Sequence, residues 1–104
     1  MILELVLFDN PPNLDRQTEL EGARNVVAKW RANPDLIRKH FMRTEDGAQG
    51  GAVYLWKSRA AAEAAHGPEW RAAVKARTGA EPTCRYFDLL ILLDNENDNV
   101  TEFA

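Results

Sequence analysis

The period of hydrophobic and polar positions changes repeatedly along the chain, and each change marks an expected element. Short apolar runs rich in β-branched and aromatic residues predict four strands, at Ile2–Phe8, Leu36–Arg43, Ala52–Trp56 and Thr83–Leu93. Helical spacing of apolar residues predicts a first helix that begins between Asn13 and Thr18 and ends before Asn33-Pro34. Residues that favour helix ends predict two further helical pieces, from Ser58 to His66 and from Pro68 to Gly79.

The order strand, helix, strand, strand, helix, strand predicts the fold class. Its commonest compact form is a ferredoxin-like α+β fold (βαββαβ), in which a four-stranded antiparallel sheet carries its helices on one face. The first and third strands are then central. The second strand carries Arg38, Lys39 and Arg43, a charge content that is typical of a sheet edge.

Both faces of this sheet are apolar. Along the first strand Leu3, Leu5 and Leu7 point to one side, and Ile2, Val6 and Phe8 point to the other. Helices on one face leave the other in water, so the pattern predicts a homodimer in which a second copy covers that face and encloses a cavity between two sheets. The alternative is a monomer that covers its own sheet more completely.

The polar residues on the strands suggest which face is which. Glu4 and Tyr54 carry polar groups suited to a partly wet cavity. We therefore expect the opposite set to face the helices: Leu3, Leu5, Leu7, Val53 and Leu55.

Length and charge narrow the class of protein. The chain has 104 residues, 45% of them hydrophobic, which predicts one domain over residues 1–104. Its 13 basic and 16 acidic residues are scattered and give a net charge of −3, so nucleic acid is not an expected partner. The first apolar run is too short for a membrane span or signal peptide, and Cys84 is the only cysteine; both favour a cytoplasmic location and no membrane partner.

A resemblance to a known family adds to this. A strand ending in Tyr54-Leu55-Trp56, a polar step through Ser58, an alanine-rich helix and His66 at its end resemble the antibiotic-biosynthesis-monooxygenase superfamily of dimeric α+β barrels. The run Gly50–Leu55, the alanines 60–62 and Phe87-Asp88 look most like its YdhR branch. The resemblance implies a homodimer whose apolar cavity binds a small aromatic or polyketide-like substrate. It also implies a monooxygenase that uses dioxygen and no cofactor or metal, or else a non-oxidative isomerase, cyclase or binding protein; haem oxygenation is less favoured because no second histidine is well placed.

The candidate catalytic residues are Trp56, His66 and Glu4. The resemblance implies that Trp56 donates its indole N–H to a bound carbonyl or phenolate. The alternative, equally favoured, is that Trp56 is an aromatic residue of the core. His66 is a candidate general base because an imidazole is the usual general base near neutral pH; the alternative is a solvated helix-end histidine. Burial in an apolar strand disfavours the charged form of Glu4, which suggests either a proton-transfer group or a salt bridge across the dimer to Arg85 or Arg38.

The candidate substrate-binding residues are Tyr54, His40 and Phe8. Tyr54 shares a face with Trp56, and His40 on the second strand could reach a cavity mouth or lie exposed at the edge. The acidic run Asp94–Asn99 lacks the glycine and closing glutamate of a calcium loop, so we expect a solvated turn with Val100–Phe103 after it as a short extra strand or an arm over the neighbouring subunit.

Overall fold

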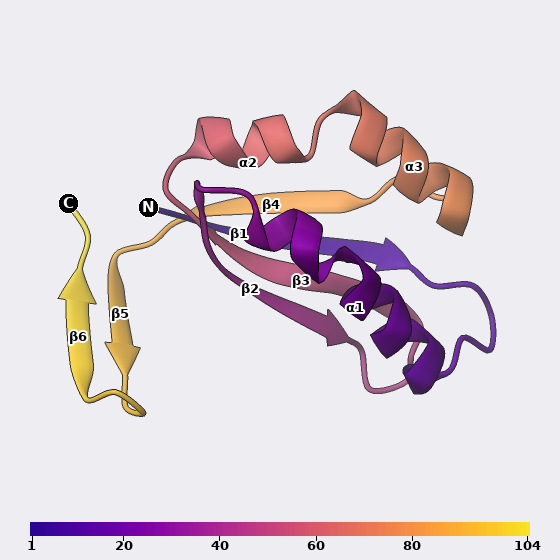
Figure 1. Ribbon diagram of the computed structural model, residues 1–104, viewed down its shortest axis with the longest axis horizontal. Coiled ribbons are helices and arrows are strands. Elements are labelled where there is room, and N and C mark those ends of the chain that lie inside the picture. The colour runs from indigo at the N-terminus through magenta and orange to yellow at the C-terminus, as the bar shows by residue number, and fades with distance from the viewer.

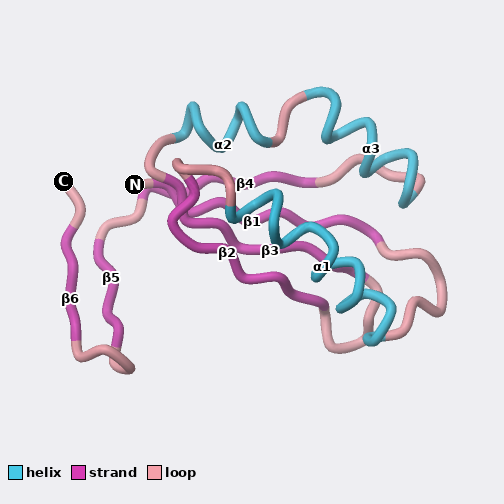
Figure 2. Tube along the Cα trace, viewed as in Figure 1, coloured by secondary structure: helices cyan, strands magenta, loops and turns pink.

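The computed structural model describes all 104 residues, from Met1 to Ala104. It confirms the α+β class, with three helices packed on one side of a four-stranded antiparallel sheet (Figures 1 and 2). None of the helices has the length and apolar composition needed to cross a bilayer. The elements are β1 (Ile2–Asp9), α1 (Arg16–Arg31), β2 (Leu36–Arg43), β3 (Gln49–Trp56), α2 (Arg59–Ala65), α3 (Pro68–Thr78), β4 (Thr83–Asp88), β5 (Ile91–Asp94) and β6 (Asn99–Glu102).

The sheet has the expected topology, with strand order β2-β3-β1-β4. The apolar strands β1 and β3 are central, and the charged strand β2 lies at an edge, as predicted. In the β1–β3 register Glu4 lies opposite Tyr54, and Ile2 lies opposite Trp56. This register brings together residues that are about fifty positions apart in the sequence.

Local signals determine where the helices begin and end. The Asp15 side chain accepts a hydrogen bond from the Thr18 amide at 2.7 Å and caps α1, so the N-cap lies between the two candidate starts Asn13 and Thr18. Ser58 caps α2 as expected, by accepting from the Ala61 amide at 3.1 Å. The next helix, α3, begins at Pro68 and ends at Thr78, and Gly79 caps it with a left-handed φ of 84°.

Our assignment of the two sheet faces is wrong. Glu4, Val6, Tyr54 and Trp56 are the buried residues beneath the helices, while the set Leu3, Leu5, Leu7, Val53 and Leu55 lies half-buried on the open face. The assignment placed Glu4 on the open face because its side chain is polar. The Glu4 carboxylate is instead hydrogen-bonded to other side chains of the same chain, so it is buried without water. The small side chains of α2 leave room beneath them for the large rings of β3, and Ala62 is completely buried there.

Close packing of two backbones requires a glycine at position 51. Gly51 pairs with Leu7 at the centre of the sheet and has φ of 157°. A Cβ added there would collide with the carbonyl oxygen of Val6. Any side chain at this position therefore requires the two central strands to move apart.

The single last strand that we expected is in fact two. Strand β4 ends at Asp88, and the chain then leaves the sheet to form a separate hairpin of β5 and β6 (Figure 1). The extra strand expected after the acidic turn is confirmed as β6. The hairpin extends beyond the end of the sheet with its apolar side chains exposed, for example Leu90 at 69% and Leu93 at 64%.

Candidate functional site

Three of the predicted site residues form one buried cluster. The Glu4 carboxylate accepts the indole N–H of Trp56 through Oε1 at 2.9 Å. Nδ1 of His66 lies 2.9 Å from the same oxygen and 3.0 Å from Oε2. The exposed fractions of Glu4, Trp56 and His66 are 0%, 0% and 1%. A carboxylate, an imidazole and an indole are thus linked inside the chain.

The fold places these residues from three separate elements. Glu4 points from the central strand β1 toward the helices, and Trp56 ends the neighbouring strand β3 on the same face. His66 is the C-cap residue of α2, and its amide donates to the Ala62 carbonyl at 3.1 Å. The short alanine helix, held at its start by Ser58, therefore sets the position of the imidazole over the sheet.

The imidazole of His66 has one satisfied nitrogen and one free nitrogen. Nδ1 faces the carboxylate, so it carries a hydrogen and donates to Glu4. In the neutral ring the lone pair is then on Nε2. That atom is buried and has no hydrogen-bond partner. Glu4 orients the ring as a carboxylate orients the histidine of a general-base pair, and the free nitrogen is the one that could accept a proton.

Aromatic rings surround this free nitrogen. The imidazole centroid lies 4.2 Å from that of Trp70, 4.7 Å from Tyr54 and 5.5 Å from Trp30. Tyr54 also stacks on Trp56 at 5.7 Å with an interplanar angle of 12°. Trp30 and Trp70 are positions that the sequence marked only as parts of helices, and no local motif identifies them as neighbours of His66.

A cleft of about 1090 Å³ lies on the other side of these rings, between the sheet and the helices α1 and α3. Trp30, Tyr54 and Trp70 line it, as does the candidate Phe8. Glu4, His66 and Trp56 do not line it, so the hydrogen-bonded cluster is one aromatic layer behind the cleft. This cleft lies within a single chain and is distinct from the cavity that the sequence predicts between two sheets, which stays a prediction.

The sequence also missed Lys39, which lies in this cleft. Its Nζ lies 3.9 Å from the Trp30 ring centroid, 4.0 Å from that of Phe41 and 4.5 Å from that of Tyr54. Burial, and secondarily the nearby charge of Lys29, lower the pKa of Lys39 to about 7, against a raising effect of Glu4.

An irregularity in β2 explains why Lys39 and not His40 reaches the site. The register shifts between Leu36 and Arg38, so that Leu36 pairs with Trp56 and Lys39 pairs with Tyr54 on the helix side. His40 consequently pairs with Val53 on the open face and is exposed. The candidate His40 is therefore not brought together with the other site residues.

The proposed salt bridge of Glu4 across a dimer is also not formed. Arg85 is opposite Leu5 on the open face, and Arg38 is opposite Leu55 on the same side. The carboxylate of Glu4 points the other way and is used within its own chain. Neither arginine can reach it.

Two tyrosine hydroxyls and one thiol also lie near Glu4. Burial raises the pKa of the Tyr54 and Tyr86 hydroxyls, and the charge of Glu4 adds to this effect. Burial also raises the pKa of the Cys84 thiol, which is a free cysteine. Cys84 is therefore a thiol at neutral pH and a poor nucleophile.

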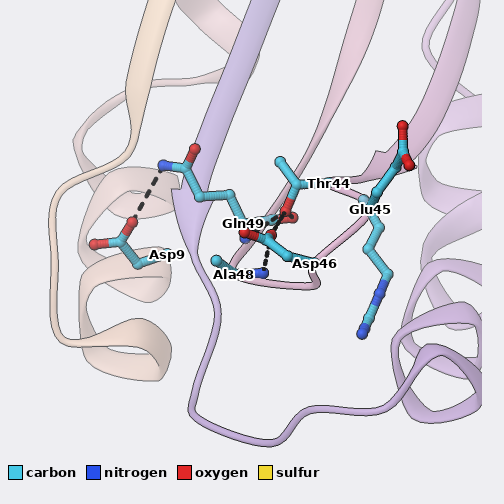
Figure 3. A pocket seen from close by; sticks show the side chains of 7 residues that line it. Asp9, Thr44, Glu45, Asp46, Ala48 and Gln49 are labelled. Carbon is cyan, nitrogen blue, oxygen red and sulfur yellow. Dashed lines mark hydrogen bonds between the residues drawn. The ribbon is translucent and has the colours of Figure 1, made fainter.

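A second hollow lies at the turn between β2 and β3 (Figure 3). Here the Asp46 carboxylate accepts from the Ala48 amide and from the Thr44 hydroxyl, both at 2.9 Å, and Gln49 donates to Asp9 at 3.2 Å. These bonds stabilise the turn itself, and they lower the pKa of Asp46. The hollow is open and polar and carries no candidate chemistry.

Comparison with known proteins supports the fold only. No family model matches the chain, and no curated protein matches it. Among solved structures, the chain is similar to an antibiotic biosynthesis monooxygenase, with 16% identity and a TM-score of 0.66; the match covers 86% of this chain and 99% of that one. It is also similar to Rv0793 from Mycobacterium tuberculosis, with 16% identity and a TM-score of 0.65; the match covers 86% of this chain and 94% of that one. A third similar structure is a monooxygenase from the gene ActVA-Orf6 of Streptomyces coelicolor, solved with the ligand nanaomycin D. It has 19% identity and a TM-score of 0.64, and the match covers 83% of this chain and 84% of that one.

Proposed function

We propose that the protein is a cofactor-independent monooxygenase that oxidises a small aromatic substrate in the cleft between its sheet and helices. The observation that carries the proposal is the buried Glu4–His66 pair directly behind the aromatic wall of a 1090 Å³ cleft. The chain shares its fold with two solved monooxygenases over more than four fifths of its length, and the reaction is proposed by analogy with them.

The proposed reaction needs no electrons beyond those of the substrate. A ring CH₂ group beside a phenolic ring loses a proton, and the resulting anion forms a C–O bond with dioxygen. Proton uptake gives a hydroperoxide, whose O–O bond breaks with loss of water to leave a carbonyl. One oxygen atom enters the product and the other becomes water, so CH₂ and O₂ are converted to C=O and H₂O.

The chain would supply a base and a dry, oriented site for this reaction. Nε2 of His66 takes the proton, while Glu4 holds the ring through Nδ1 and stabilises the imidazolium. Trp56 supports Glu4 from the other side, so its indole N–H acts on the carboxylate and not on the substrate. Tyr54 and Trp70 line the cleft and also contact the imidazole, so the proposal requires these two rings to part for the substrate to reach Nε2.

The direct test is oxygen uptake with a panel of hydroxyarenes, quinols and anthrones, followed with an electrode in metal-free buffer. We expect one dioxygen consumed per substrate converted, without release of hydrogen peroxide. His66→Asn is the informative variant, because an amide nitrogen can replace Nδ1 toward Glu4 while Nε2 is lost. Its matched control is His40→Asn on the open face, which should retain the wild-type rate.

One observation favours a second candidate, a non-oxidative isomerase, cyclase or binding protein. Nε2 of His66 is sealed behind rings and does not line the cleft. If aromatic compounds bind in the cleft while none of the panel supports oxygen uptake, this second function replaces the first. Oxygen uptake that persists in His66→Asn would keep the reaction class but remove His66 as its base.

We also propose that the protein is a homodimer through the open face of the sheet. Leu3, Leu5 and Leu55 lie on this face with no element of the chain above them, and Phe87 beside them is 40% exposed. Burying a large apolar side chain contributes about 1.5–3 kcal/mol, so the same face of a second copy is the expected cover. The exposed β5–β6 hairpin would add contacts by reaching over the partner.

We place the chain nearest to the YdhR branch of the superfamily. This rests on the run from Gly50 to Leu55 and on Phe87-Asp88. A reducing, cytoplasmic location agrees with the free Cys84. Size-exclusion chromatography of cell extract with an antibody to the chain would test the assembly and the compartment together.

A further inference from the structure

The cleft has a charge opposite to that of the whole protein. Its lining contains five basic and two acidic side chains, a formal charge of +3, in a chain whose net charge is −3. The basic members are Arg16, Lys29, Lys39, Arg43 and Arg77, and the acidic members are Glu19 and Glu45. Positive charge is therefore concentrated where a ligand would lie, and this attracts anions into the cleft.

Most of these cations have an evident partner or lie in water. Arg43 forms a salt bridge with Glu19 at 2.8 Å, and Arg16, Lys29 and Arg77 are exposed. Lys39 differs because it is half-buried and takes part in none of the salt bridges of the chain. The close partners of this ammonium are aromatic rings and not a carboxylate, so an anionic ligand would supply the ion pair that it lacks.

The surroundings of this ammonium also specify the shape of the ligand. Its Nζ lies within 4.5 Å of the Trp30, Phe41 and Tyr54 ring centroids. A flat ring that stacks in the cleft against Phe41, the one of these three rings that is exposed, would bring a substituent next to Nζ. The same site thus offers an apolar surface for a ring and one positive charge for an acidic group.

We propose that the cleft selects aromatic ligands bearing an anionic oxygen, a carboxylate or an ionised phenol, and that Lys39 binds this oxygen. The inference rests on the proposed function for the location of the substrate, and it narrows the substrate class. Lys39 would hold the acidic group while the rings orient the flat part of the molecule. It also would stabilise the negative charge that the oxidation builds on the substrate.

The test measures binding without chemistry, so it is independent of oxygen uptake. Quenching of tryptophan fluorescence by 2-naphthoate and by its neutral analogue 2-naphthalenemethanol would be titrated near pH 6.5. We expect the anion to bind at least about tenfold more tightly than the alcohol, as for a charge-assisted hydrogen bond. Lys39→Met, which keeps the apolar stem, should abolish this preference, while Lys57→Met on the exposed loop after β3 should retain it.

A pH series of the wild type provides a second readout that needs no variant. Lys39 loses its proton as pH rises through about 7, whereas the naphthoate stays ionised. The charged groups that act on it are Lys29 from α1 and Glu4 from β1. The preference for the anion should therefore be full at pH 6 and decline above pH 7, by up to about tenfold per unit.

The outcomes separate the two proposals. Equal affinities of the two naphthalenes, or a preference that survives in Lys39→Met, would overturn the role of Lys39 and leave the aromatic cleft intact. If neither compound binds to the wild-type protein, the aromatic cleft is overturned as a binding site, and so is the selectivity inferred from it. Circular dichroism checks that Lys39→Met is folded.

Discussion

Replacing the buried carboxylate by an amide, Glu4→Gln, should destabilise the protein strongly although the shape is conserved. The carboxylate accepts from two donors, Trp56 Nε1 and His66 Nδ1, each at 2.9 Å. A glutamine has only one acceptor oxygen. In the protein both donors face Oε1, and a glutamine oxygen at that place accepts from both only as a neutral group. Its amide group then stands in place of Oε2, 3.0 Å from Nδ1, and brings a buried N–H against another donor with no acceptor.

The magnitude follows from these two losses. A buried donor without an acceptor costs about 1–3 kcal/mol, and a charge-assisted bond is worth roughly 1 kcal/mol more than a neutral one. We therefore expect a loss of about 2–4 kcal/mol in the free energy of unfolding, out of the roughly 5–15 kcal/mol typical of a domain. In urea this lowers the midpoint by roughly 1–2 M.

The assay is urea unfolding followed by tryptophan fluorescence and by circular dichroism. Glu63→Gln is the matched control, because Glu63 is an exposed residue paired with Arg59 on the surface of α2. Its effect should stay within about 0.5 kcal/mol. A Glu4→Gln variant as stable as wild type would refute the reasoning, since it would mean that the carboxylate does not hold both donors.

Three further variants test the packing and the caps around the site. Gly51→Ala should lower the free energy of unfolding by more than about 2 kcal/mol because its methyl group meets the Val6 carbonyl. Gly22→Ala, on the open surface of α1, should raise it by about 0.5–1 kcal/mol. Equal effects of the two substitutions in chemical denaturation would contradict this. Trp56→Phe removes one donor to Glu4 and should lower the melting temperature by about 4–12 °C, more than Trp70→Phe at the partly exposed ring. Ser58→Ala should cost about 0.5–2 kcal/mol of stability by uncapping α2, and an unchanged melting curve would show that the cap does not hold the helix that carries His66.

The sequence predicted the element order because its signals are local. The first three apolar runs, Ser58 and the Gly67-Pro68 break each act within a few residues and are found where expected. The last apolar run is divided between β4 and β5 because the chain leaves the sheet after Asp88. The resemblance also singled out Trp56 and His66, which the structure brings together on the Glu4 carboxylate. Glu4 was notable from the sequence alone, as a carboxylate in an apolar strand.

The relative placement of these elements was harder to predict. Alternation divides a strand into two sides but does not tell which side faces the helices when both are apolar. We used polarity to choose, and this failed because Glu4, His66 and Trp56 satisfy one another across more than fifty residues. The shift in register after Leu36 has no sequence signal, so Lys39 was counted as an edge charge and His40 as a site residue.

The most direct test of the account is where an aromatic ligand binds. Nuclear magnetic resonance of the ¹⁵N-labelled protein would be recorded during titration with 2-naphthoate. We predict that the largest shifts occur at the indole N–H groups of Trp30 and Trp70 and at the Tyr54 amide, which belong to the cleft between sheet and helices. Shifts confined to Leu3, Leu5 and Leu55 on the open face would contradict the account and return the cavity to the space between two sheets.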